Sequence, residues 1–164
     1  MWKVRKSKIH GKGIVATQNI KKGQKIIQYI GEKILKSEGD RRSEKRIKKY
    51  LNSKVTGSVY IFELNKKYDI DGSPLYNKAR YINHSCNPNC EVDIINNEIW
   101  ISAIKKIKKG EELKYDYGYE FDKDDYKDHV CKCGSENCIG FIISSDDWPK
   151  YGKYINKLIK NNSL

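Results

Sequence analysis

The chain has 164 residues, which suits one domain with a single hydrophobic core. Its 33 basic and 21 acidic residues give a formal net charge of +12, and 38% of the residues are hydrophobic. No run approaches the roughly 18 apolar residues that a membrane span requires, and the N-terminus lacks the apolar stretch of a secretory signal, so we expect no membrane partner and a protein of the cytoplasm or nucleus.

The N-terminal third carries the positive charge. Residues 1–54 contain 17 Lys and Arg against 4 acids, a net of +13, whereas residues 55–164 contain 16 against 17, a net of −1. Such a segment is either a solvated surface or a site for a polyanion such as nucleic acid. Because five arginines stand against 28 lysines, bidentate base readout is disfavoured. The expected contact is nonspecific and made with the DNA backbone.

Short β-branched and aromatic runs, separated by Gly, Asn or Lys-Gly turns, predict a mainly β protein. The expected strands are residues 13–16, 24–30, 58–64, 67–70, 92–95, 98–104 and 111–115.

Two stretches have helical spacing. The first begins at Ser37, with Asp40 three residues later as a capping box, and its apolar stripe is Ile47, Tyr50 and Leu51. The second runs from about Pro149 to Lys160. Because both apolar stripes are narrow, we expect both helices to pack thinly at the edge of the domain.

The segment "YINHSCNPNC", residues 81–90, is rich in side chains that hydrogen-bond locally. Asn and Ser side chains compete with strand pairing for backbone groups, and Pro88 interrupts regular structure, so an ordered loop of turns is expected. We interpret so polar a loop as a binding site.

Three of the five cysteines form a C-x-C-x4-C motif at residues 131–138. Without a signal peptide disulfides are not expected, and a compact group of thiols favours structural zinc, which takes four soft ligands. A distant residue must supply the fourth ligand. Cys86 in the polar loop is the first candidate, with Cys90 and His129 as alternates. The less favoured alternative is that the cysteines are merely small buried residues, because Gly134 and Gly140 supply the turn geometry that a metal site requires.

Tyrosines recur at alternate positions in "EELKYDYGYEF", residues 111–121. In a strand, Tyr115 and Tyr117 would point to the same face. Core packing explains a single tyrosine well. Several tyrosines, Tyr60 among them, are expected to converge next to the polar loop and the metal site. Such a set is better explained as an aromatic slot for a ligand with an apolar stem and a cationic head, such as a lysine side chain.

Four segments in this order resemble the SET-domain protein lysine methyltransferases. Residues 8–32 resemble the opening segment of the family, and residues 79–90, "ARYINHSCNPNC", resemble its asparagine-histidine signature. Residues 110–119, "GEELKYDYGY", resemble its closing tyrosine signature, and residues 131–142, "CKCGSENCIGFI", resemble the post-SET zinc motif.

The resemblance implies a fold of small curved sheets and short helices, in which the C-terminal part threads under a loop as a pseudoknot. It divides the chain into a SET domain at residues 1–120, a zinc-binding post-SET segment at residues 121–145 and a helical tail at residues 146–164.

The resemblance also implies S-adenosylmethionine as the cofactor. His10, Lys12 and Gly13 match a segment that contacts it largely through backbone groups. Asn83 and His84 match the pair that holds its amino-acid and adenine portions.

The remaining site residues follow from the same resemblance. Tyr60 matches a tyrosine shared by the cofactor pocket and the lysine channel, and Tyr117 matches the tyrosine at the methyl-transfer site. Tyr115 stands where the family has Phe or Tyr, and its extra hydroxyl predicts mainly monomethylation, with dimethylation as the limit. The four zinc ligands are matched by Cys86, Cys131, Cys133 and Cys138, which leaves Cys90 as a spare thiol.

The resemblance thus implies a protein lysine N-methyltransferase that acts on a histone tail in chromatin, in the nucleus of its own cell or of a host. The acidic stretch 120–128 would attract a basic tail. The alternatives are an enzyme for a ribosomal, bacterial chromatin or host protein, and an inactive SET-fold module that binds peptide or nucleic acid. The intact Asn83, His84 and Tyr117 favour an enzyme.

Overall fold

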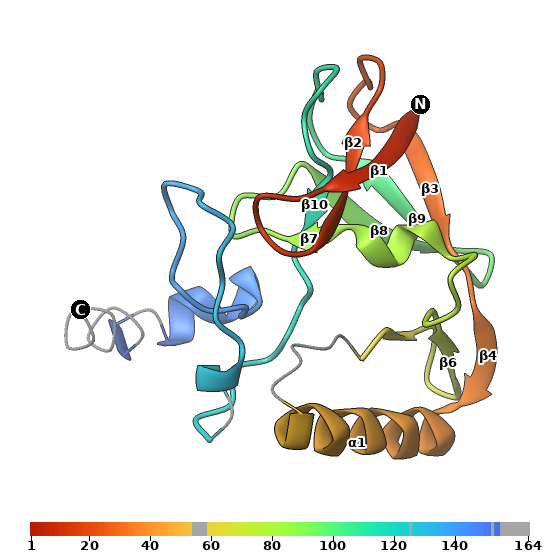
Figure 1. Cartoon of the computed structure of the whole chain (residues 1–164), viewed down its shortest axis with the longest axis vertical. Helices are drawn as coiled ribbons and strands as arrows, with labels where there is room; N and C mark the ends of the chain where they lie inside the picture. Colours follow the sequence, from red (N-terminus) through yellow and green to blue (C-terminus); the bar gives the residue numbers. More distant parts are fainter. Residues whose placement is uncertain (54–58, 125, 152, 155–164) are drawn as a thin grey trace. The chain divides into compact units, whose positions relative to one another are not determined.

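The structure, a computed structural model, describes residues 1–53, 59–124, 126–151 and 153–154 (Figure 1). It confirms the mainly β architecture, with small sheets of two or three strands in the described part of the chain. None of the helices there is long and apolar enough to cross a membrane.

The chain forms two compact units, and each is described by itself. The first unit contains residues 1–24, residues 81–91 and the described residues from 102 onward. The second contains the described residues of 25–80 together with residues 92–101. The boundaries expected at residues 120 and 145 stay a prediction.

A β hairpin opens the first unit. Strands β1 (Trp2–Lys6) and β2 (Lys12–Ala16) pair antiparallel. On the other side of β2, the N–H of Leu113 donates to the carbonyl of Ile14 over 2.8 Å. Both of these side chains are fully buried, so they anchor the hairpin. Strand β1 was not predicted from the sequence, because Lys and Arg occupy its three exposed positions. Only Trp2 and Val4 then remain to show the alternation of apolar and polar residues.

Two very short strands join the polar loop to the tyrosine segment. Strands β7 (Asn83–His84) and β10 (Lys114–Tyr115) pair in parallel, and the N–H of Ser85 donates to the carbonyl of Tyr115 over 3.1 Å. The strand predicted at residues 111–115 is thus reduced to its last two residues. The segment before them meets β2 at an isolated bridge between Val15 and Glu112 and through backbone hydrogen bonds on either side of it. The pseudoknot threading stays a prediction.

The C-terminal part of the first unit has little regular structure. A bridge between Val130 and Phe141 closes the cysteine-rich segment. The short 3₁₀ turns Tyr126–Asp128 and Ser145–Asp147 flank it. Of the helix expected from Pro149 to Lys160, residues 149–151 and 153–154 are helical, and the rest lies outside the described residues.

The second unit holds one three-stranded sheet and most of another. In the first sheet, β6 (Tyr68–Asp71) pairs antiparallel with both β4 (Glu32–Leu35) and β5 (Ile61–Glu63). In the second sheet, β9 (Glu98–Ala103) lies between β3 (Lys25–Tyr29) and β8 (Cys90–Ile95). The two residues between β8 and β9 are asparagines with positive φ, as a two-residue hairpin turn requires.

Most predicted strands are confirmed to within two residues at each end. The strands predicted at residues 58–64 and 111–115 are the exceptions, because β5 begins only at Ile61 and β10 only at Lys114. Tyr60 has a φ of +60°, which is incompatible with strand geometry. β4 was missed because it has only four residues and two of them are charged.

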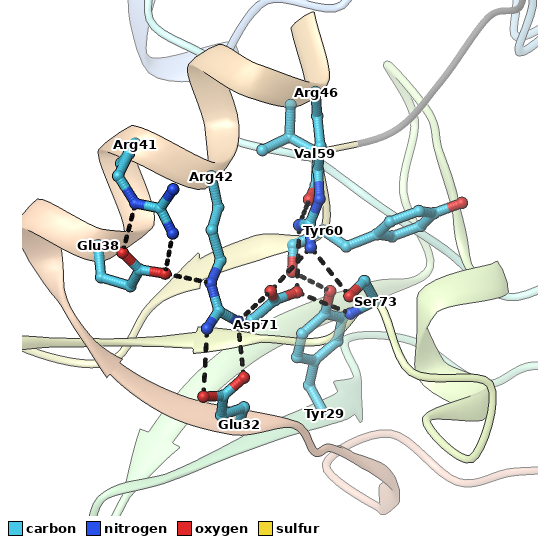
Figure 2. Close-up of polar contacts among 10 residues, drawn as sticks. All are labelled: Tyr29, Glu32, Glu38, Arg41, Arg42, Arg46, Val59, Tyr60, Asp71 and Ser73. Atoms are coloured by element: carbon cyan, nitrogen blue, oxygen red, sulfur yellow. Dashed lines mark hydrogen bonds and ion pairs between the residues drawn. The ribbon is translucent and has the colours of Figure 1, made fainter. Parts of the chain in front are cut away.

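Helix α1 (Lys36–Ser53) packs on β6 through charged side chains (Figure 2). The carboxylate of Asp71, at the end of β6, is only 3% exposed. Arg42 Nη1 and Arg46 Nη2 each lie 2.8 Å from Asp71 Oδ2, and Arg42 also pairs with Glu32 at 2.6 Å. One buried carboxylate therefore holds two successive turns of the helix.

Two details of the predicted helix are wrong. The helix begins at Lys36, so Ser37 lies inside it and does not act as the N-cap of a capping box. Ile47 is 47% exposed and does not contribute to an apolar docking face. The side chains of Tyr50 and Leu51 lie outside the described residues.

Candidate active site

Asn83 ties the polar loop to the turn between β1 and β2. Its side chain is buried. The amide nitrogen Nδ2 lies close to four acceptors, which are Glu112 Oε1 at 2.8 Å, Ser7 Oγ at 3.1 Å, Lys12 O at 3.1 Å and His10 O at 3.4 Å. The predicted residues His10, Lys12 and Asn83 are thus brought together, and the first two take part through their backbone carbonyls.

Glu112 completes this network, and sequence reasoning missed it. Ser7 Oγ–H donates to the Glu112 carboxylate, with distances of 2.7 Å to Oε1 and 3.0 Å to Oε2. A Cβ at Gly13 would stand 2.3 Å from Glu112 Oε1, so only glycine permits this close approach. Glu112 lies in the tyrosine signature at residues 110–119. Its partners Asn83 and Ser7 are 29 and 105 residues away in the sequence, so no local pattern can show the contacts.

His84 is buried next to the tyrosine segment and the cysteines. The backbone N–H of Tyr117 donates to His84 Nδ1 over 3.2 Å, so the ring proton resides on Nε2 in the neutral imidazole. Nε2 lies 3.7 Å from Cys86 Sγ. Both ring nitrogens are therefore engaged within the protein.

Three tyrosine rings follow one another along the closing segment. The ring centroids of Tyr115 and Tyr117 are 5.0 Å apart, and those of Tyr117 and Tyr119 are 5.8 Å apart. Tyr117 Oη–H donates to the carbonyl of Ile82 over 3.0 Å, and Tyr115 is buried. The predicted convergence of Tyr115 and Tyr117 is present, although the strand supposed to produce it ends at Tyr115.

Tyr60 belongs to the second unit, where several groups fix its geometry (Figure 2). Its carbonyl accepts a hydrogen bond from Tyr29 Oη over 3.0 Å. Arg46 Nη1 donates to the carbonyl of Val59, directly before it. The guanidinium of Arg80 lies 4.0 Å from the centroid of the Tyr60 ring. Helix α1 thus helps to hold the left-handed backbone at Tyr60, a conformation that costs free energy by itself.

The structure gathers four thiols, from Cys86, Cys131, Cys133 and Cys138. All four Sγ atoms lie within 4.8 Å of one another. Cys86 Sγ is 3.8 Å from Cys131 Sγ and 3.9 Å from Cys138 Sγ. Four thiolates bound tetrahedrally at about 2.3 Å from one zinc ion stand about 3.8 Å apart, so this donor set suits zinc in both chemistry and spacing.

The segment around the thiols is shaped for such a cluster. Gly134 and Gly140 have φ of +67° and +82°, and the N–H of Cys131 donates to the carbonyl of Gly140 over 2.9 Å. Hydrogen bonding with the Cys131 thiol outweighs burial and, together with His84, lowers the pKa of Cys86 to about 4. The cluster therefore favours a thiolate at Cys86, the charged form that binds metal.

The two alternate ligands lie elsewhere. Cys90 Sγ contacts Asn89 Oδ1 at 3.5 Å, and burial raises the pKa of Cys90 to about 12. The His129 ring packs edge-on against Tyr119, with 5.3 Å between centroids. Among the three candidates for a fourth ligand, geometry selects Cys86.

The small sheets, the asparagine-histidine loop and the tyrosine segment that pairs with it are the arrangement of a SET domain. Residues 11–118 match the family model described as "SET domain". The chain belongs to the SET-domain family.

The chain is similar to much longer proteins. It is 39% identical over 141 residues to "Histone-lysine N-methyltransferase, H3 lysine-4 specific" of Aspergillus oryzae, a match that covers 84% of this chain and 11% of that protein. The protein of the same name from Saccharomyces cerevisiae is also 39% identical over 141 residues, with 84% and 13% covered. Human "Histone-lysine N-methyltransferase 2D" is 36% identical over 137 residues, with 81% and 2% covered. The chain thus spans 13% or less of the length of these relatives.

Proposed function

We propose that this chain is an S-adenosylmethionine-dependent protein lysine N-methyltransferase. The observation that carries the proposal is the pairing of β7 with β10, which sets Asn83 beside Lys114 and His84 beside Tyr115. This pairing joins the predicted cofactor loop to the segment of Tyr115 and Tyr117 within one compact unit. The names of its relatives, all histone-lysine N-methyltransferases, agree with this chemistry.

The cofactor would bind where Asn83 meets the β1–β2 turn. The two N–H groups of Asn83 Nδ2 have four protein acceptors within reach, so its carbonyl oxygen Oδ1 is the atom that would accept from the ligand's ammonium group. The bound cofactor supplies an electrophilic methyl group on a sulfonium. The glycine at position 13, at the start of β2, leaves room for the Glu112 side chain to lie against the backbone next to this turn.

The tyrosines would prepare the lysine. Direct displacement requires a neutral amine, whereas free lysine has a pKa near 10.4 and is mostly protonated at neutral pH. Burial between aromatic rings disfavours the ammonium, and a nearby positive charge repels it. Tyr117, whose hydroxyl is oriented by the carbonyl of Ile82, would align the amine and stabilise the polarised methyl group. The buried Tyr115 would limit the number of methyl groups added, and for Tyr60 the role that the family resemblance implies stays a prediction.

The four cysteines would hold one structural zinc ion. Because Cys86 follows the Asn83–His84 pair by two or three residues, the metal would fix the C-terminal segment to the loop that binds the cofactor. Zinc would therefore act through the shape of the site and not in the chemical step.

The substrate we propose is a lysine in a histone tail, which places the protein in chromatin and hence in a nucleus. Two of the relatives are named for lysine 4 of histone H3, so an H3 tail is the first peptide to test. We further propose that the main product is monomethyl-lysine, with dimethyl-lysine as the limit.

The decisive experiment incubates zinc-loaded protein with labelled S-adenosylmethionine and separate panels of nucleosomes, free histones and cell lysate. We expect label on histone H3, and a loss of about 10²-fold in turnover for Tyr117→Phe. Tyr76→Phe is the matched control, because Tyr76 is 60% exposed. Label confined to a lysate protein would support the nonhistone alternative. Failure to bind S-adenosylmethionine in calorimetry would refute the proposal and leave a binding module.

A further inference from the structure

Two turns of the first unit have the same sequence, Ile-Lys-Lys-Gly. One is Ile20–Gly23 and the other is Ile107–Gly110. Both end in a glycine with positive φ, +77° at Gly23 and +95° at Gly110. The two segments thus repeat one local structure, although 87 positions separate them in the sequence.

The two turns lie side by side and are bonded to each other (Figure 1, orange-red and teal). The N–H of Ile20 donates to the carbonyl of Ile107 over 2.8 Å, and the N–H of Ile107 donates to the carbonyl of Ile20 over 3.0 Å. Both isoleucine side chains are fully buried. Because the isoleucines point inward, the lysines that follow them face the solvent.

The two paired turns, with the two residues before the second one, carry six lysines, which we call the lysine cluster. Its members are Lys21, Lys22, Lys105, Lys106, Lys108 and Lys109. All six are exposed, and among the described residues none of them forms an ion pair. Glu111 is the one acid within the two segments 17–24 and 104–111. The ammonium group of Lys105 donates to Asn87 Oδ1 over 3.0 Å.

We propose that the lysine cluster binds the phosphate backbone of double-stranded DNA without regard to sequence. Six like charges on adjacent turns repel one another, and a polyanion that neutralises them releases its own counterions on binding. Lysines are compact point charges, and the cluster has no arginine to read base edges in a bidentate manner. The contact reaches beyond the N-terminal third, because four of the six lysines lie at residues 105–109.

Other polyanions fit this surface less well. Stable binding to a membrane surface adds insertion of apolar side chains to charge attraction, and the two isoleucines of the turns are buried. A folded acidic protein would need shape complementarity, whereas these charges stand on two exposed turns. A DNA duplex presents a regular row of phosphates and requires neither feature.

The test measures binding of the zinc-loaded chain to two labelled duplexes of unrelated sequence by fluorescence anisotropy, across a series of salt concentrations. For the wild type, a plot of log Kd against log salt should have a slope of about 3 to 5, as expected for four to six phosphate contacts. Substitution of Lys21, Lys22, Lys108 and Lys109 by Gln should lower this slope by about 3 and weaken binding at low salt by about tenfold or more.

Two controls separate local from global charge. The same four positions changed to Arg should retain binding. A variant with Lys45, Lys48, Lys49 and Lys66 changed to Gln removes the same net charge from exposed positions of the second unit, and it should retain most of the affinity. Thermal unfolding checks that each variant is folded.

Three results would overturn the proposal. The first is an equal loss of DNA affinity in the Gln variant and in the second-unit control. The second is a difference in affinity between the two duplex sequences. The third is stronger binding to anionic vesicles or to polyglutamate than to DNA. No methyl transfer occurs in this assay, so its outcome is independent of the proposed enzymatic function.

Discussion

Replacing Asp71 by alanine should detach helix α1 from strand β6. The carboxylate is 3% exposed and is shared by Arg42 and Arg46. Removing one partner of a buried ion pair costs about 3–5 kcal/mol in general. The two arginines are 26% and 22% exposed, so they can regain water, and we expect a smaller loss of about 2–3 kcal/mol in the free energy of unfolding. For a protein of this size that corresponds to a fall in Tm of about 4–12 °C.

The effect should depend on pH in a defined direction. Burial by itself raises the pKa of Asp71, but hydrogen bonds from Arg46, Arg42 and Ser73 outweigh it and hold the pKa well below its usual value. Because the folded pKa is depressed, the stabilisation is fully present above the unfolded pKa of about 3.9 and is lost as the pH falls through the folded pKa. The difference in stability between wild type and Asp71→Ala should therefore be constant from about pH 7 to pH 5 and shrink below about pH 4.

Urea titrations of the wild type, Asp71→Ala and Glu44→Ala at several pH values check this reasoning. Glu44 is also on α1, but its side chain is 70% exposed and its pairing with Lys48 is loose, at 3.8 Å. We expect little change from Glu44→Ala. If the two variants lose equal stability, or if the effect of Asp71→Ala is unchanged at pH 3, then α1 is not held by the buried carboxylate. Asp71 also holds Arg46, whose guanidinium donates to the carbonyl of Val59, directly before Tyr60. Asp71→Ala should therefore also lower turnover, because it loosens the backbone at Tyr60.

The remaining predictions concern the site itself. Cys86→Ser should reduce the zinc content measured by atomic absorption from one ion per chain toward none, whereas Cys90→Ser should leave the zinc content unchanged. An equal loss of zinc in both variants would exclude Cys86 as a selective ligand. Tyr115→Phe should shift the products seen by mass spectrometry toward di- and trimethyl-lysine, and abundant trimethyl-lysine from the wild type would contradict the proposed role of Tyr115. Gly13→Ala places a methyl group 2.3 Å from Glu112 Oε1, so calorimetry should show weaker binding of S-adenosylmethionine; unchanged affinity would separate this turn from the cofactor site.

Local sequence patterns were sufficient to predict the mainly β class, five of the strands and the position of the long helix. They also identified the polar loop, the tyrosine segment and the thiol motif, because each is a run of neighbouring residues with a distinct chemistry. The resemblance of four ordered segments then indicated the family, which the match of residues 11–118 shows.

The contacts that organise the site come only from the path of the chain. Whether Cys86, Cys90 or His129 joins the other three thiols was open in the sequence, and the structure decides it by bringing Cys86 Sγ within 3.8 Å of Cys131 Sγ. The Ser7–Glu112 hydrogen bond joins residues 105 positions apart. The sequence gives the chemistry of each side chain directly, but the distance between two side chains depends on the whole path of the backbone between them.

The same limit explains the two charged features that the sequence hid. The basic residues of the N-terminal third suggested either a solvated surface or a site for a polyanion, yet two arginines of α1 hold a buried carboxylate, because β6 packs against the helix. The lysines of two Ile-Lys-Lys-Gly turns form one cluster because Ile20 pairs with Ile107. Charge can be counted from the sequence, but electrostatic interaction depends on separation and burial, and these two quantities are set by the tertiary structure.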